Sequence, residues 1–203
     1  AMVVNLDIQG FFPNTTHEQV LIALRRDLTP LLSETAVRFL AEICCFRGGL
    51  PIGAPTSPAL ANLVMRPIDA SLAKAAKRFD LQYTRYADDL TFSGGTDAHR
   101  IIPFVEKVLS ERGYEIEGKK TNIFRRGRRQ IVTGLVVNER VNLPRHIRRK
   151  LRAAVHRRTK GGQPMWHGRP ITDSELQGYV AALGAVRPEE SAAHRGKLRG
   201  RKE

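Results

Sequence analysis

Residues 82–94 read QYTRYADDLTFSG, and this stretch decides the fold. β-prone residues stand on both sides of Asp88-Asp89, so the pattern predicts two antiparallel strands joined by a tight turn. Two adjacent carboxylates at a bend repel each other and add nothing to a core. Either solvent or a bound cation must therefore neutralise them, and for the pair taken alone an ordinary solvated turn is the alternative interpretation.

A third carboxylate lies near the start of the chain. Residues 3–8, Val-Val-Asn-Leu-Asp-Ile, form a short β-prone apolar run that carries Asp7 close to its end. If this strand joins the hairpin, Asp7 and the pair Asp88-Asp89 converge at one end of the sheet. Three carboxylates make the hard, oxygen-rich kind of site that Mg²⁺ prefers, and two ions about 4 Å apart can activate a hydroxyl and stabilise a leaving group.

The remaining elements predict an α+β fold, with an antiparallel β-sheet and helices packed on one face. Apolar periodicity, caps, glycines and prolines predict helices at about 16–27, 33–46, 57–72, 97–112 and 172–186, short strands at 114–117, 121–125 and 130–138, and basic helical structure from 144. We expect a domain boundary near residue 140. The expected organisation is a domain over 1–140, a helical region over 141–188 and a flexible basic tail over 189–203.

The charge of the chain is strongly basic and unevenly distributed. Lys and Arg number 34 against 20 Asp and Glu, which gives a net charge of +14. Residues 144–203 alone hold 15 Lys and Arg against 5 Asp and Glu. This balance favours a polyanionic partner such as nucleic acid, because basic side chains that neutralise phosphates release condensed counterions. A solvated basic surface is the alternative.

Several other classes of function find no support in the sequence. No apolar run approaches the roughly 18 residues of a membrane span, and the first residues lack a signal-peptide pattern, so we expect a cytoplasmic protein without a membrane partner. Adjacent Cys44 and Cys45 are expected to be reduced and buried on a helix. The six histidines lack metal-ligand spacing to one another.

Several motifs in a fixed order give the sequence a family resemblance. They are Leu6–Phe12 (LDIQGFF), Leu50–Pro58 (LPIGAPTSP), Tyr86–Asp89 (YADD), Gly113–Thr121 ending in KKT, and the triplet Val132–Gly134 (VTG). In this order and spacing the chain resembles the reverse transcriptases, specifically their bacterial retron and group II intron branch. The resemblance runs from Asp7 to about Pro188. It implies a polymerase-type palm over 1–140, followed by a small basic thumb.

The resemblance also implies the roles of the acidic residues. Asp7 and Asp88 would ligate two Mg²⁺ ions, for which Mn²⁺ could substitute, with Asp89 assisting. The backbone carbonyl of Ile8 would contact the metal on the nucleotide side. Lys120 would protonate the departing pyrophosphate, since a cation beside a triphosphate also stabilises developing charge; a solvated pair with Lys119 is the alternative.

Further residues would contact substrate and nucleic acid. Phe12 stands where the family keeps a bulky residue against the sugar 2′ position, although it could be a plain core aromatic. Glycine lets the backbone of Pro51, Ile52 and Gly53 approach the nascent base pair, and Tyr86 belongs to the same substrate-binding set. The expected phosphate contacts of the thumb are Arg145, Arg148, Arg149, Arg152 and Arg157. Trp166 and Tyr179 could stack on bases or simply pack.

The function implied by the resemblance is RNA-directed DNA synthesis. The expected partners are an RNA template, a DNA or RNA primer, deoxynucleoside triphosphates and a cognate noncoding RNA, with the oligomeric state open. Ile52 replaces the glutamine usual in the family, and no fingers region precedes the first motif, so we expect the isolated chain to polymerise poorly. A catalytically inactive nucleic-acid-binding or antiviral defence module is the alternative, and a template-independent nucleotide transferase is a third hypothesis.

Overall fold

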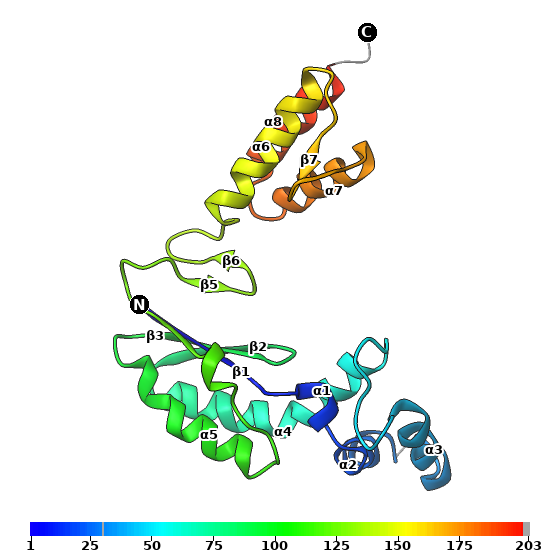
Figure 1. Ribbon diagram of the computed structural model, residues 1–203. Helices are drawn as coiled ribbons and strands as arrows, with labels where there is room; N and C mark the ends of the chain where they lie inside the picture. Colours follow the sequence, from blue (N-terminus) through cyan, green and yellow to red (C-terminus); the bar gives the residue numbers. More distant parts are fainter. Residues whose placement is uncertain (30, 201–203) are drawn as a thin grey trace. The chain divides into compact units, whose positions relative to one another are not determined.

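The computed structural model describes residues 1–29 and 31–200. They form two compact units, Ala1–Arg128 and Arg129–Glu203, of which the second is described to residue 200 (Figure 1). The division between the units falls after Arg128, whereas the sequence predicted a boundary near residue 140, so residues 130–138 belong to the second unit.

The first unit is built on a four-stranded antiparallel sheet. The strands lie in the order β2-β3-β1-β4, so β1 is an interior strand although it comes first in the chain. The bounds are β1 Met2–Asp7, β2 Leu81–Tyr86, β3 Asp89–Gly94 and β4 Asn122–Phe124. The hairpin predicted from residues 82–94 is thus the β2–β3 pair.

The helices of the first unit start where the sequence supplies caps. Thr16 and Gln19 form a capping box at the start of α2, and Pro58 lies in the first turn of α4, where its missing N–H costs nothing. α4 continues through Pro67 as one helix. The bounds are α1 Phe11–Asn14, α2 His17–Leu28, α3 Glu34–Cys44, α4 Ser57–Arg78, η1 Ala98–Ile101, α5 Ile102–Ser110 and η2 Gly118–Lys120.

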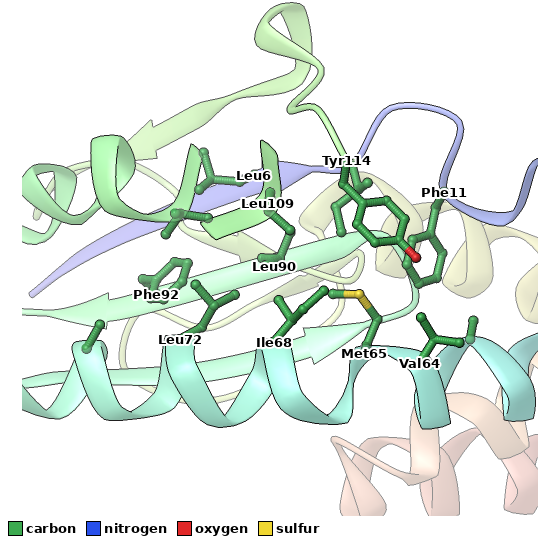
Figure 2. Packing of buried hydrophobic residues seen from close by; sticks show 14 of the residues in the cluster. Leu6, Phe11, Val64, Met65, Ile68, Leu72, Leu90, Phe92, Leu109 and Tyr114 are labelled. Carbon is green, nitrogen blue, oxygen red and sulfur yellow. The ribbon is translucent and has the colours of Figure 1, made fainter. Parts of the chain in front are cut away.

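The core of this unit lies between the sheet and the helices α4 and α5, which cover the same face (Figure 1). Leu90 and Phe92 from β3 point toward Ile68 and Leu72 of α4 in Figure 2, and all four side chains are almost fully buried. Alternation along β3 and helical spacing along α4 place these apolar positions on facing surfaces. The predicted α+β fold with helices on one face is confirmed.

Two local features differ from what the sequence pattern favours. Phe39 and Ile43 share the apolar helical spacing of α3, yet these side chains are 64% and 60% exposed, and the helix packs through Val37 and Ala41. The predicted strand at 114–117 is reduced to a single bridge between Ile116 and Ile8. Residues 115–117 nevertheless lie against the end of β1, where the Gln9 N–H donates to the Glu115 carbonyl and the Glu117 N–H donates to the Asp7 carbonyl.

The two cysteines are reduced, as expected, but they are less buried than the sequence predicted. Cys44 and Cys45 are free thiols at the end of α3, and each is only partly buried. Burial raises the pKa of the Cys45 thiol, which keeps it protonated. Within residues 1–29 and 31–200, no helix combines the length and the apolar character needed to cross a membrane.

In the second unit three helices, α6, α7 and α8, pack together with the small β7–β8 hairpin, and another small hairpin, β5–β6, precedes them in the chain. Its buried residues include Leu151, Val155, Ile171, Val180 and Leu183. The bounds are β5 Ile131–Val132, β6 Leu135–Val136, α6 Arg145–Thr159, β7 Met165–Trp166, β8 Arg169–Pro170, α7 Asp173–Gly184 and α8 Pro188–Arg199.

The structure of the second unit bears on two expectations, one for the Trp166 and Tyr179 rings and one for the tail over 189–203. The Trp166 and Tyr179 rings stack with their centroids 4.2 Å apart, and Trp166 is buried, so this pair packs within the unit. The flexible tail expected over 189–203 is instead helix α8 as far as Arg199, with residues 201–203 outside the described residues. Pro188 lies in the first turn of this helix. The hydroxyl of buried Ser191 donates to the Val180 carbonyl, and this contact holds the helix against α7.

Candidate active site

The register of the sheet brings the predicted carboxylates together. β1 and β3 run antiparallel with Asp7 paired to Asp89, the last pair of the ladder. Beyond it, the Ile8 N–H donates to the Asp88 carbonyl at 3.0 Å. Asp7, Asp88 and Asp89 therefore lie at the same end of the sheet, where β1 ends and β3 begins, as the sequence predicted.

The turn between β2 and β3 leaves Tyr86 exposed and the two carboxylates partly exposed. Ala87 has a φ of 51°, in the left-handed region that few residues other than glycine adopt, and it reverses the chain between Tyr86 and Asp88. Tyr86 pairs with Asp89 across the hairpin and is 72% exposed. The turn thus presents a free aromatic ring beside the two carboxylates.

Lys120, although distant in the sequence, lies at the same end of the sheet as the three aspartates. Its Nζ lies 2.8 Å from Asp7 Oδ1, and this hydrogen bond raises the pKa of the Lys120 ammonium. The preceding segment is fastened to β1, since the Glu117 N–H donates to the Asp7 carbonyl at 2.8 Å. The sequence predicted a site role for Lys120, and the structure adds its direct contact with Asp7.

The carboxylate cluster holds more negative charge than its surroundings neutralise. Partial burial, followed by the charges of Asp88 and Asp7, raises the pKa of Asp89 above its usual value, and Lys120 offsets this only in part. Across the described ranges, no group of three or more His, Cys, Asp or Glu side chains is spaced to hold a metal ion. The oxygen-only donor set and the raised pKa nevertheless fit a hard divalent cation, whose binding would require the side chains to adjust.

The raised pKa of Asp89 predicts a stability gain on substitution. Because the folded chain binds this proton more tightly than the unfolded chain, the ionised carboxylate destabilises the fold above that pKa. Without divalent cations at neutral pH, Asp89→Asn should raise the melting temperature by roughly 2–4 °C, and this gain should vanish as the pH falls through the raised pKa. Calorimetry across pH measures the difference. Asp97→Asn, on an exposed surface, is the control, and an equal gain there would contradict the explanation.

A loop carrying the second motif lies against the turn after Asp7. The Leu50 N–H donates to the carbonyls of Phe12 and Thr15, each at 3.1 Å. A Cβ on Gly49 would lie 2.1 Å from the Pro13 carbonyl oxygen, so only glycine permits this approach. Phe12, half-buried against the core, is therefore next to the start of the loop.

The loop itself is fixed at one end and open at its centre. The Ser57 hydroxyl donates to the Pro51 carbonyl at 2.7 Å, which holds the loop to the first turn of α4. Ile52 is 78% exposed, and Gly53 has a φ of 87° with open space around it. The backbone of Pro51, Ile52 and Gly53 is thus accessible, and the sequence predicted these residues as a substrate-binding set.

Two polar contacts inside the unit were not predicted from the sequence. The buried Tyr114 hydroxyl lies 2.9 Å from Thr15 Oγ1, which joins the segment leading to Lys120 to the end of α1. Arg85 and Asp69 form a largely buried ion pair behind the aspartate turn. Strand alternation is the signal for the second contact, because Arg85 shares a face with buried Leu81.

The predicted phosphate-binding arginines all lie on α6, but they differ in availability. Arg148 is paired with Glu190 of α8 at 2.7 Å, so its charge is already neutralised within the unit. The other four side chains are exposed, namely Arg145, Arg149, Arg152 and Arg157. The second unit therefore carries a basic helix surface on α6.

Comparisons with known proteins agree on a family. A family model described as reverse transcriptase (RNA-dependent DNA polymerase) matches residues 1–162. The retron Mx65 reverse transcriptase of Myxococcus xanthus is 36% identical over 219 residues, covering 98% of this chain and 50% of that protein. The retron Ec86 reverse transcriptase of Escherichia coli is 35% identical over 197 residues, covering 95% and 57%. The chain thus spans about half the length of the curated relatives that it matches.

A solved structure supports the fold. The apo telomerase from Candida tropicalis, truncated from its C-terminal domain, superposes with a TM-score of 0.53 over 68% of this chain and 34% of that chain. Its sequence identity is 11%, so the likeness concerns the fold alone.

Proposed function

The chain belongs to the reverse transcriptase family, in its retron-type branch, and we propose that it carries the catalytic centre of an RNA-directed DNA polymerase. The single observation that carries the proposal is the register that pairs Asp7 with Asp89 and bonds Ile8 to the Asp88 carbonyl. The reaction extends a primer 3′ end with deoxynucleoside triphosphates, using an RNA template. We propose that the first unit acts as the palm and the second as the thumb.

The proposed cofactor is a pair of Mg²⁺ ions. Asp7 and Asp88 would hold both, with help from Asp89 and the Ile8 carbonyl, because carboxylate and carbonyl oxygens are the ligands that Mg²⁺ prefers. When bound, the ions supply Lewis-acid chemistry: they lower the pKa of the primer hydroxyl and neutralise charge on the transferred phosphoryl group. The excess negative charge around Asp89 supports such a site.

Lys120 is the proposed proton donor to the leaving pyrophosphate. Its side chain is 62% exposed while that of Asp7 is 13% exposed, so the ammonium can leave Asp7 by rotation of its own stem. An ammonium that has left Asp7 is still charged at neutral pH, because the ordinary pKa of lysine lies far above 7, and stabilisation of a triphosphate requires this charge.

The loop of the second motif, together with Tyr86 and Phe12, would bind the incoming nucleotide. We propose that the backbone of Pro51, Ile52 and Gly53 lies along the nascent base pair, with Tyr86 on the other side of the carboxylates. Phe12 would stand against the sugar 2′ position and exclude ribonucleotides by its volume. The hydrogen bonds from the Leu50 N–H support this arrangement, because they fix the loop relative to Phe12.

The basic surface of α6 predicts a salt-dependent affinity for nucleic acid. Replacing Arg145, Arg149 and Arg152 with glutamine should weaken binding of a template–primer duplex and reduce the slope of log K against log salt by about 2–3, since each phosphate contact releases counterions. Fluorescence anisotropy at several salt concentrations measures the slope.

A matched control removes the same charge elsewhere in the chain. Arg25, Arg38 and Arg66 already pair with acidic side chains of the first unit, so their replacement with glutamine should leave the slope nearly unchanged. An equal fall in both triple variants would mean that total charge, and not the α6 surface, determines binding.

Primer extension tests the proposed reaction. We expect extension to require an RNA template, a primer with a free 3′-hydroxyl, deoxynucleoside triphosphates and a divalent cation, Mg²⁺ or Mn²⁺. The assay uses this chain, which spans about half the length of these relatives, and any longer protein that includes it. Extension without a template would indicate a nucleotide transferase, and binding without extension in every form tested would indicate an inactive nucleic-acid-binding or defence module.

A further inference from the structure

The side chain of Arg85 lies almost fully buried on the face of the sheet that packs against α4. Arg85 follows Leu81 and Tyr83 at alternate positions of β2, so it points into the core, and its side chain is 7% exposed. A guanidinium cannot lose its proton in a protein, so burial is tolerated only where hydrogen bonds satisfy its charge.

Asp69 of α4 supplies most of that satisfaction. The Arg85 Nε and Nη2 donate to the two carboxylate oxygens of Asp69, each at 2.8 Å, in a bidentate pair. The Tyr83 hydroxyl donates to the same carboxylate at 2.7 Å. Burial opposes the charge of Arg85, but its bonds to Asp69 hold the pKa above its ordinary value.

The remaining arm of the guanidinium reaches the aspartate turn. Nη1 of Arg85 donates to the Ala87 carbonyl at 3.0 Å, and Cζ lies 5.9 Å from the centroid of the Phe11 ring. Ala87 is the residue in the left-handed conformation, which costs an alanine of order 1 kcal/mol and persists only where the surroundings enforce it.

Each of the two carbonyls of the turn therefore accepts a hydrogen bond from a different element. Arg85 fixes the carbonyl of Ala87, and the Ile8 N–H of β1 fixes that of Asp88. The peptide between them sets the direction of the Asp88 side chain. A side chain that joins α4, the turn and Phe11 determines how that turn faces Asp7.

We propose that Arg85 is a positioning residue, which holds the left-handed turn at Ala87 so that Asp88 and Asp89 face Asp7. It acts through the backbone of the turn and touches neither substrate nor cation. The inference rests on the proposed function for its catalytic consequence, but the conformation of the turn can be measured separately.

Arg85→Lys separates positioning from charge. Lysine keeps the cation beside Asp69 but lacks the planar fork needed to reach Asp69 and the Ala87 carbonyl together. We expect the Ile8 amide, whose partner is the Asp88 carbonyl, to exchange with solvent about tenfold faster in this variant. We also expect half-saturation by Mn²⁺, measured by electron paramagnetic resonance, at about tenfold higher concentration.

Two further variants show whether these effects belong to the turn. Arg25→Lys alters an exposed pair with Glu34 in the same unit and should change neither measurement. Adding Ala87→Gly to Arg85→Lys should recover part of the lost Ile8 protection, because glycine adopts positive φ without strain. A melting curve of each variant identifies effects that follow from general destabilisation.

The outcomes distinguish the two proposals. Faster Ile8 exchange and weaker Mn²⁺ binding in Arg85→Lys, with rescue by glycine and no change in Arg25→Lys, support the positioning role. Unchanged Ile8 exchange in Arg85→Lys overturns it. If Ile8 exchange rises but the unsubstituted chain binds no Mn²⁺, the positioning of the turn is supported and the proposed metal chemistry fails.

Discussion

Asp88→Asn should reduce primer extension by about 1,000-fold or more, while the fold stays intact. Asparagine keeps the size of the side chain but removes a charge and an anionic oxygen, and metal-assisted stabilisation of a phosphoryl transition state amounts to several kcal/mol. The backbone carbonyl of Asp88 accepts a hydrogen bond from the Ile8 N–H, and the substitution retains this contact. Single-nucleotide extension rates measure the loss.

The control for Asp88→Asn lies outside the carboxylate cluster. Asp97→Asn removes an exposed carboxylate just after the β3 strand and should leave the rate within about twofold of the unsubstituted protein. Extension at an unchanged rate in Asp88→Asn would refute the catalytic assignment of the turn. A loss of the folded state in this variant would show instead that Asp88 serves stability.

Phe92→Ala should destabilise the first unit by about 3–5 kcal/mol. Phe92 is fully buried, stacks on Tyr83 with ring centroids 4.9 Å apart, and faces α4 in Figure 2. Its removal leaves a cavity between the sheet and the helix. Since small domains are stable by only about 5–15 kcal/mol, the substitution removes a large part of the total. Urea denaturation followed by circular dichroism measures the change.

Ile123→Ala provides the matched control on the same sheet. Ile123 lies on β4 and is 45% exposed, so its truncation should cost about 1 kcal/mol or less. Equal losses in both variants would mean that the sheet is stabilised mainly by strand pairing, and not by the core beneath it.

Much of the first unit follows from local patterns in the sequence. The β2–β3 hairpin was predictable because β-prone residues flank an acidic bend, and the start of α2 because Thr16 stands at its N-cap. The association of Asp7 with the hairpin rested on family motifs, since nothing near Asp7 in the sequence specifies its partner strand. The structure then supplies that partner as Asp89.

The wrong or missing predictions share a physical reason. The apolar spacing of α3 identifies a hydrophobic face at Phe39 and Ile43, but spacing cannot say which element covers a face. The sequence did not identify Arg85 as a buried residue, because arginine is ordinarily exposed and only the distant carboxylate of Asp69 on α4 allows its burial. The composition of residues 189–199 suggested disorder, but packing against α7 stabilises a helix there. Each outcome depends on a contact between distant residues.

The interior position of β1 has a consequence for synthesis on the ribosome. β1 leaves the exit tunnel long before β3 and β4, the two strands that pair with it. The nascent chain must keep an apolar strand without these partners until residues 89–94 of β3 have emerged, and such segments are prone to aggregation. The site is completed later still, because Lys120 and the second partner strand β4 follow only when residues 120–124 are made.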